Sequence, residues 1–223
     1  MNFLKYKLWI ESALLALLIF MGSLAYLFVQ NESVNVILMN RSLAFTAIIM
    51  IDLSFIVSGT SYFWGIGKTK MSYRKMVGVI GFVISLVHAS IASNIFFGSY
   101  VWITYTFKYV YSLLPALLAI LIMTMMVVIS NWGIPNLLGG VLWRRLLRVG
   151  YVAIFFIIIH ATILSYSEWI YWFTKFSPIF PPLSLIAFLF SVFTIILRIA
   201  LFIVLKRKSV QPSQIEVPLN SSK

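Results

Sequence analysis

The chain contains two histidines, His88 and His160, and each lies within a long apolar stretch. At the helical rise of 1.5 Å per residue, both imidazoles are expected about 18–20 Å beyond the basic residues Lys75 and Arg148 that precede their helices. Imidazole nitrogen is a standard axial ligand of haem iron, and two imidazoles fill both axial positions of an electron-transfer haem. Two histidines at one depth on parallel helices therefore predict a single haem, with His88 and His160 as its iron ligands.

A more ordinary role for each histidine is a hydrogen bond to a neighbouring helix. That role explains one intramembrane histidine well, but two at matched depth favour a shared ligand. Zinc fits less well, because no third or fourth ligand stands near either histidine and the chain has no cysteine. The residues at helical spacing from the two histidines are expected to border a flat cofactor: Gly81, Ser85, Ala92, Ala153, Phe156 and Leu164.

Membrane-spanning helices must position these histidines. Of 223 residues, 62% are hydrophobic and 10% are charged, whereas an ordinary soluble domain is about half apolar and about a quarter charged. A bilayer core of about 30 Å requires roughly 20 apolar residues in a helix. The sequence therefore predicts an all-α integral membrane protein, a bundle of six transmembrane helices over about 9–29, 43–64, 76–97, 109–129, 146–165 and 183–205.

The net charge of +12 indicates how the chain is oriented in the membrane. Lys and Arg cluster between the apolar stretches instead of sharing one water-exposed face, which argues against nucleic acid as a partner. One set of helix ends carries Lys5, Lys7, Lys68, Lys70, Arg74, Lys75, Arg144, Arg145, Arg148, Lys206, Arg207, Lys208 and Lys223. The opposite set carries Arg41, Lys108 and Lys175. By the positive-inside rule, both termini of this multi-pass protein are expected in the cytoplasm, in the inner (cell) membrane.

Several other charged residues are candidates for chemistry. Asp52 is expected near mid-membrane, where a carboxylate is usually paired or protonated, and it is a hypothetical proton carrier. Arg198 is expected to extend to the cytoplasmic interface; the alternative is an ion pair with Asp52, or a polar contact to a quinone or flavin. Arg144, Arg145 and Arg148 chiefly mark orientation, although arginine forks would also suit a flavin phosphate or an acidic donor protein.

Two motifs carry a family resemblance that covers about residues 41–175. One is Arg74-Lys75-Met76-Val77-Gly78 followed by His88, and the other is Trp143-Arg144-Arg145-Leu146 followed by Arg148, Tyr151 and His160. Together with Ser130-Asn131, they resemble the ferric reductase-like transmembrane family, and within it the haem-binding membrane subunit of bacterial methionine sulfoxide reductase systems. The resemblance implies a six-helix bundle that holds b-type haem and passes electrons across the membrane.

The sequence also departs from that family. Leu147 stands where members often carry a further histidine, and Arg74 and Lys75 occupy the region of the inner partner on the third helix. Leucine cannot ligate iron, so we expect one haem at the outer site only. A flavin (FMN or FAD) or a quinone at the cytoplasmic side would then complete the electron path.

The expected organisation is a first helix and outer loop (1–40), a ferric reductase-like core (41–175), a sixth helix (176–205) and a disordered cytoplasmic tail (206–223). The expected function is electron transfer from a separate cytoplasmic reductase or a membrane quinol to a periplasmic or extracellular oxidoreductase. The chain has no flavin or nicotinamide domain of its own and no visible catalytic group, so enzyme activity would depend on that partner. A small transporter or channel, and a membrane scaffold with structural histidines, are the alternatives.

Overall fold

The computed structural model describes residues 3–31, 33, 35–65, 73–98, 106–130 and 134–210. Over these ranges the secondary structure is helical, without strands, and six helices are long and apolar enough to cross a membrane. The prediction of an all-α, multi-pass membrane protein is thereby confirmed.

The six long helices lie close to the predicted ranges. They are α1 (Phe3–Asn31), α2 (Val36–Phe63), α3 (Tyr73–Gly98), α4 (Thr106–Ser130), α6 (Gly150–Lys175) and α7 (Leu183–Val210). A helix that the sequence analysis did not predict, α5 (Ile134–Leu146), and a single 3-10 turn, η3 (Leu147–Val149), lead into α6. The predicted tail begins within α7, and its part beyond residue 210 lies outside the described residues.

Local signals explain where the helices begin and end. The side chain of Asn35 accepts a hydrogen bond of 2.8 Å from the backbone N–H of Leu38 and so caps the start of α2. Helix α2 therefore begins before residue 41, where the expected core was divided from the first helix. At the end of α6, Phe176 adopts a left-handed conformation with φ of 47°, which stops the helix ahead of Pro181 and Pro182.

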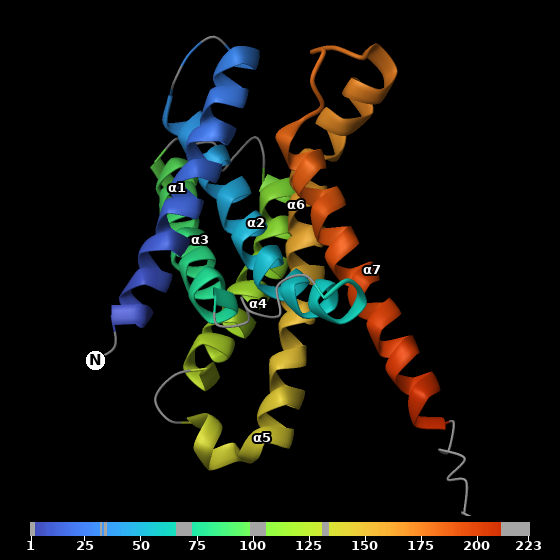
Figure 1. The fold of residues 1–223 in the computed structure, drawn as a ribbon. Coiled ribbons are helices and arrows are strands. Elements are labelled where there is room, and N and C mark those ends of the chain that lie inside the picture. Colours follow the sequence, from blue (N-terminus) through green and yellow to red (C-terminus); the bar gives the residue numbers. More distant parts are fainter. Residues whose placement is uncertain are drawn as a thin grey trace, which may run out of the picture.

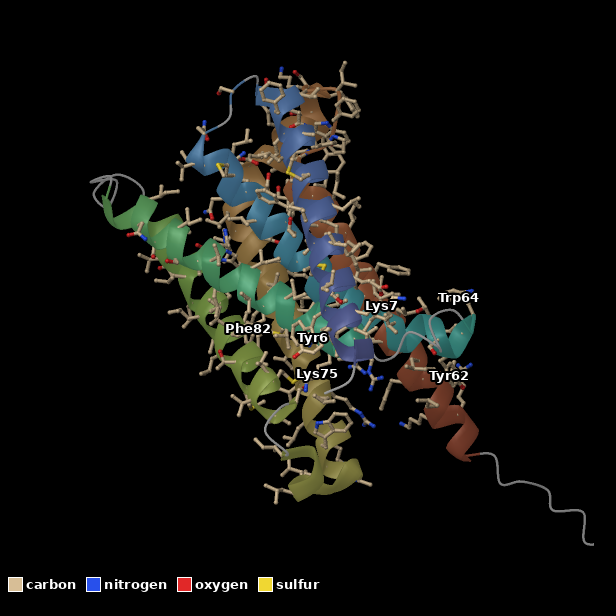
Figure 2. All side chains as sticks on the ribbon, turned by 60° about the vertical axis from the view of Figure 1, so that its left-hand side comes forward. Tyr6, Lys7, Tyr62, Trp64, Lys75 and Phe82 are labelled. Carbon is tan, nitrogen blue, oxygen red and sulfur yellow. The ribbon has the colours of Figure 1, made fainter. Side chains whose placement is uncertain are left out.

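Helix α2 lies at the centre of one part of the bundle, where it packs against α3, α1 and α7, while α4 packs mainly against α6. Helix α1 begins and α7 ends at the same end of the bundle, where α5 also lies (Figure 1); we call this end the terminal face. Lys7 and Lys75 lie toward the terminal face, and the last turns of α2, which carry Tyr62, turn aside there (Figure 2).

The packing is that of a bundle in lipid. A buried cluster joins Phe55 of α2, Phe82 of α3, Met126 of α4 and Ile154 of α6 at the middle of the molecule. Outside this cluster, large apolar side chains stay open to the surroundings, for example Leu18 at 71% and Leu121 at 67%. Exposed apolar area on this scale is stable against acyl chains and not against water, so the bilayer is a direct contact partner.

Candidate functional site: a pair of histidines between two helical hairpins

His88 is half-buried on α3 and is held by the backbone of α2. Its Nδ1 lies 3.2 Å from the carbonyl oxygen of Asn40 and 3.0 Å from the side-chain oxygen of the same residue. A carbonyl oxygen can only accept a hydrogen bond, so Nδ1 must carry the proton and donate. The other ring nitrogen, Nε2, then keeps its lone pair and can act as a ligand.

His160 on α6 repeats this arrangement against α4. Its Nδ1 lies 2.8 Å from the carbonyl oxygen of Ser112, a residue that is buried on α4. Nδ1 therefore donates here as well, and Nε2 again keeps its lone pair. In both cases the accepting carbonyl stands 48 residues before the histidine.

The structure brings the two imidazoles together. They lie close enough for a charge on one ring to be felt by the other. Helix α3 packs chiefly on α2, and α6 packs chiefly on α4. The histidines therefore belong to two units, a first hairpin formed by α2 and α3 and a second formed by α4 and α6.

The more ordinary role considered for the histidines is present on one side of each ring. The Nδ1 atoms bond a neighbouring helix, as that role requires. For the Nε2 atoms no hydrogen bond is recorded with the described residues. Metal-bound histidines have this same arrangement, in which the nitrogen away from the metal donates to a carbonyl or carboxylate and fixes the ring.

An internal repeat relates the two hairpins, and the sequence analysis missed it. The shift in residue number that takes Asn40 to Ser112 also takes His88 to His160. Under the same shift Val77-Gly78 becomes Val149-Gly150, and His88-Ala89-Ser90-Ile91 becomes His160-Ala161-Thr162-Ile163. A comparison of the chain with itself at this offset would have found the repeat.

The repeat extends to helix packing. A side chain at Gly78 would meet Ser54 on α2. A side chain at Gly150 would first meet the ring of Phe55 on α2 of the first hairpin, and then Met126 on α4. Ser54 and Met126 are themselves equivalent under the same shift. Each hairpin thus brings its two helices together at a glycine, as small residues allow in membrane bundles.

Not every residue expected at the histidine site lies free to border a cofactor. A Cβ atom at Gly81 would stand 2.9 Å from Cβ of Met50 and 3.0 Å from the backbone nitrogen of Ile51. Gly81 therefore serves contact between α3 and α2. Ala153 is fully buried in the central cluster. Within the described residues, no group of three or more His, Asp, Glu or Cys is placed to hold a metal ion, so a zinc site of the usual kind is not built there.

Asp52 bonds Ser191 and not Arg198, which was the partner considered in the sequence. It is 1% exposed on α2, and the hydroxyl of Ser191 on α7 donates a 2.6 Å hydrogen bond to its Oδ2. Its Oδ1 has no hydrogen-bond partner. Among the described residues the ion pairs are Lys7–Glu11 and Arg41–Glu168, so the Asp52–Arg198 pair is not formed.

The arginines gather near the terminal face instead. The guanidinium of Arg198 lies over the ring of Tyr151, 5.2 Å from its centroid, and Arg74 lies over Phe55 at 5.7 Å. Arg148 in η3 shares a cavity with Arg198, whereas Arg145 is exposed. The side chain of Arg144 lies outside the described residues.

A second cavity near the terminal face lies between α1, α2 and α3. It has a volume of about 310 Å³, and its walls are mainly apolar. The polar groups that line it are Glu11, Ser12, Ser54, Tyr73 and Arg74. An apolar space with a few polar groups is the usual form of a site for a ring-shaped organic molecule.

Comparison with known proteins adds no homologue to these observations. No protein-family model matches the chain, and no curated protein matches it.

Proposed function

We propose that the chain is a haem b-binding transmembrane electron-transfer subunit, with one haem held between α3 and α6 by His88 and His160. The observation that carries the proposal is the paired placement of the two imidazoles. Each is held through Nδ1 by a backbone carbonyl, and the two rings lie near enough to interact electrostatically. The resemblance to the ferric reductase-like transmembrane family points the same way.

The residues present fit such a group. With Nδ1 donating, each neutral imidazole offers Nε2 as the ligand, and the carbonyls of Asn40 and Ser112 hold the ring planes. The two ligands come from different hairpins, so each hairpin would supply one ligand to a group held between them. When bound, haem supplies one-electron redox chemistry; the chain supplies its ligands, their orientation and an apolar surrounding.

The electron donor and acceptor belong to the same proposal. The cavity between α1, α2 and α3 suits a quinone head group or a flavin ring, because Tyr73 and Arg74 offer hydrogen-bond donors along an apolar wall. We place this cavity at the cytoplasmic side by the positive-inside rule. A separate cytoplasmic reductase or a membrane quinol would supply electrons there, and a periplasmic or extracellular oxidoreductase would receive them on the other side of the inner membrane.

An absorbance spectrum tests the proposal directly. The full-length protein is purified in detergent and measured oxidised and then dithionite-reduced, as wild type, His88→Ala and His160→Ala. We expect a b-type spectrum with about one haem per chain, lost in both variants. Asn94→Ala is the matched control, because Asn94 lies further along α3 and bonds only the carbonyl of Ser90 in its own helix.

A wild-type protein that stays colourless after haem is supplied during expression would overturn the proposal. Transport, or a scaffold role with structural histidines, would then be the working hypothesis. Asn94→Ala must keep the wild-type spectrum; if it loses the pigment as well, the loss in the histidine variants does not identify ligands.

A further inference from the structure

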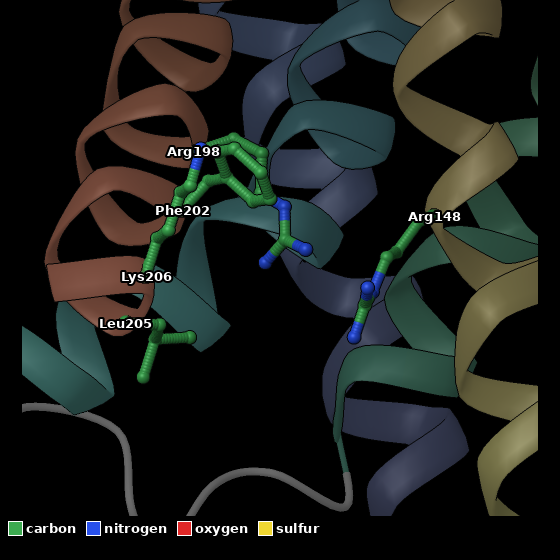
Figure 3. A pocket seen from close by; sticks show the side chains of 5 residues that line it. All are labelled: Arg148, Arg198, Phe202, Leu205 and Lys206. Atoms are coloured by element: carbon green, nitrogen blue, oxygen red, sulfur yellow. The ribbon is translucent and has the colours of Figure 1, made fainter. Parts of the chain in front are cut away.

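A cationic cavity lies near the terminal face between η3 and the second half of α7. It has a volume of about 280 Å³ and is lined by Arg148, Arg198, Phe202, Leu205 and Lys206. Figure 3 shows the guanidinium groups of Arg148 and Arg198 approaching the same space from opposite walls. Three basic residues and two apolar residues therefore share one small space.

Neither arginine of this cavity forms an ion pair with an acidic residue that the structure describes. Glu11 pairs with Lys7, and Glu168 pairs with Arg41 on other helices. Asp52 accepts from Ser191 instead of from an arginine. Like charges held together near lipid repel one another, and an anion between them would remove that repulsion.

The second arginine is held in place for such an anion. Arg198 stacks on the ring of Tyr151 at the start of α6, and Arg74 lies near enough to interact with both Tyr151 and Arg198. A stacked guanidinium loses less side-chain freedom when it binds, and its planar fork matches two oxygens of a phosphate. The charge near the cavity thus comes from α3, η3 and α7 together.

The apolar wall indicates where the anion comes from. Phe202 is 57% exposed and Leu205 is 46% exposed, and both lie on the α7 surface beside the cavity. A free phosphate compound needs only the cations, whereas a phospholipid would also lay an acyl chain along this surface. Basic pockets at the cytoplasmic ends of membrane helices are suited to anionic head groups in this way.

We propose that the cavity formed by Arg148, Arg198, Phe202, Leu205 and Lys206 binds the phosphate of an anionic phospholipid, with the two guanidinium groups on the phosphate and Phe202 and Leu205 against an acyl chain. This site would fill whether or not the histidines hold haem. It would tie η3, and through it the start of α6, to α7 at the membrane surface.

The test is thermal unfolding of the purified full-length protein in detergent with short-chain lipids. Dioctanoyl phosphatidylglycerol is titrated against wild type, Arg148→Gln, Arg198→Gln and Arg145→Gln, with dioctanoyl phosphatidylcholine as the neutral lipid. Arg145→Gln is the matched control, because it removes the same charge three residues from Arg148 but does not line the cavity. Inorganic phosphate and flavin mononucleotide are the free-phosphate probes.

We expect phosphatidylglycerol to raise the Tm of wild type and of Arg145→Gln. In Arg148→Gln and Arg198→Gln, we expect the apparent Kd for phosphatidylglycerol to rise by about tenfold. Arg148 is exposed, so Arg148→Gln should fold even if loss of the Arg198–Tyr151 contact weakens the other variant. An equal shift with phosphatidylcholine would overturn the proposal. So would an equal loss in Arg145→Gln, or a full shift with flavin mononucleotide or inorganic phosphate alone.

Discussion

The first and second hairpins hold the same histidine in the same way but differ in what surrounds it. In both, the second helix donates from the Nδ1 atom of its histidine to a backbone carbonyl of the first helix. In both, a glycine on the second helix meets the first helix at an equivalent position. Other equivalent positions differ: buried Asp52 and Ser54 of the first hairpin correspond to Thr124 and Met126 of the second.

The residue types differ because the two hairpins have different neighbours. Helix α2 is covered by α1 and α7, so a polar group on it can find a donor, as Asp52 does in Ser191. Helix α4 lies at the edge, and Leu114 and Leu121 on it are more than half exposed. At that edge Thr124 bonds the carbonyl of Ile120 in its own helix, because lipid offers no partner. The two hairpins thus share the histidine and the glycine at which their helices pack. They differ at positions that face other helices or lipid.

Removing one histidine at a time would break this comparison most strongly. We expect His88→Ala and His160→Ala to lose the reduced Soret absorbance completely and to the same extent, because two axial ligands contribute alike. The measurement is the reduced-minus-oxidised spectrum per mole of purified protein. If one variant kept its pigment and the other lost it, the hairpins would not contribute equally to the site.

The two packing glycines should respond differently to an added methyl group. At Gly150 a Cβ atom would collide with the ring of Phe55 and stand 2.9 Å from Cε of Met126, whereas at Gly78 it would meet only the side chain of Ser54. We expect Gly150→Ala to reduce the free energy of unfolding by about 1–3 kcal/mol. Gly78→Ala should reduce it by less than about 1 kcal/mol, because the Ser54 hydroxyl can rotate and alanine favours the helix. Denaturant titration in mixed micelles measures both, and equal effects would contradict the ranking.

Asp52 and Thr124 allow a similar comparison of buried and lipid-facing polar groups. Ser191→Ala removes the donor to Oδ2 of Asp52, whose Oδ1 already lacks one, and we expect it to destabilise the bundle by about 1–3 kcal/mol. Thr124→Ala removes a bond within one exposed helix and should change stability by no more than about 0.5 kcal/mol. In an Asp52→Asn background the effect of Ser191→Ala should shrink; an unchanged effect would show that the bond between them is not its source.

A small effect is expected from the ion pair that joins the hairpins. Arg41 on α2 and Glu168 on α6 lie 2.8 Å apart with both side chains about half exposed. Arg41→Gln should destabilise by no more than about 1 kcal/mol at low salt and by less at high salt, because exposed pairs are screened. The double variant Arg41→Gln/Glu168→Gln, unfolded at the two salt concentrations, checks this. Strictly additive single effects would mean that the pair contributes nothing of its own.

The spans could be predicted because their signal is local. A run of apolar residues is sufficient to place a helix such as α7, whose predicted start at residue 183, directly after Pro181 and Pro182, agrees with the structure. Helix α5 was not predicted, because its thirteen residues contain Pro135, Gly139 and Gly140 and are too few to cross a bilayer. The end of α6 was predicted too early, at about residue 165, because Tyr166 and Glu168 interrupt the apolar run. The helix continues to Lys175.

The partners of the polar residues could not be predicted in the same way. Asp52 and Arg198 carry opposite charges on neighbouring helices, yet they do not pair with each other. Asp52 accepts a hydrogen bond from Ser191, and the guanidinium of Arg198 lies over the ring of Tyr151. Which residues face each other depends on the rotation of each helix about its axis, and hydropathy does not report this rotation. The acceptors of the two histidines include backbone carbonyls, which side-chain types do not reveal.

That the two imidazoles are tethered by main-chain oxygen has a consequence for how the chain can change over time. Asparagine stands at position 40 and serine at position 112, yet the carbonyl is present in both cases. At position 112 mutation can replace the side chain without deleting the acceptor, whereas at position 40 it would also remove the side-chain oxygen that lies 3.0 Å from Nδ1 of His88. Among diverging descendants of such a chain, the histidines would be retained, and position 112 would vary more freely than position 40.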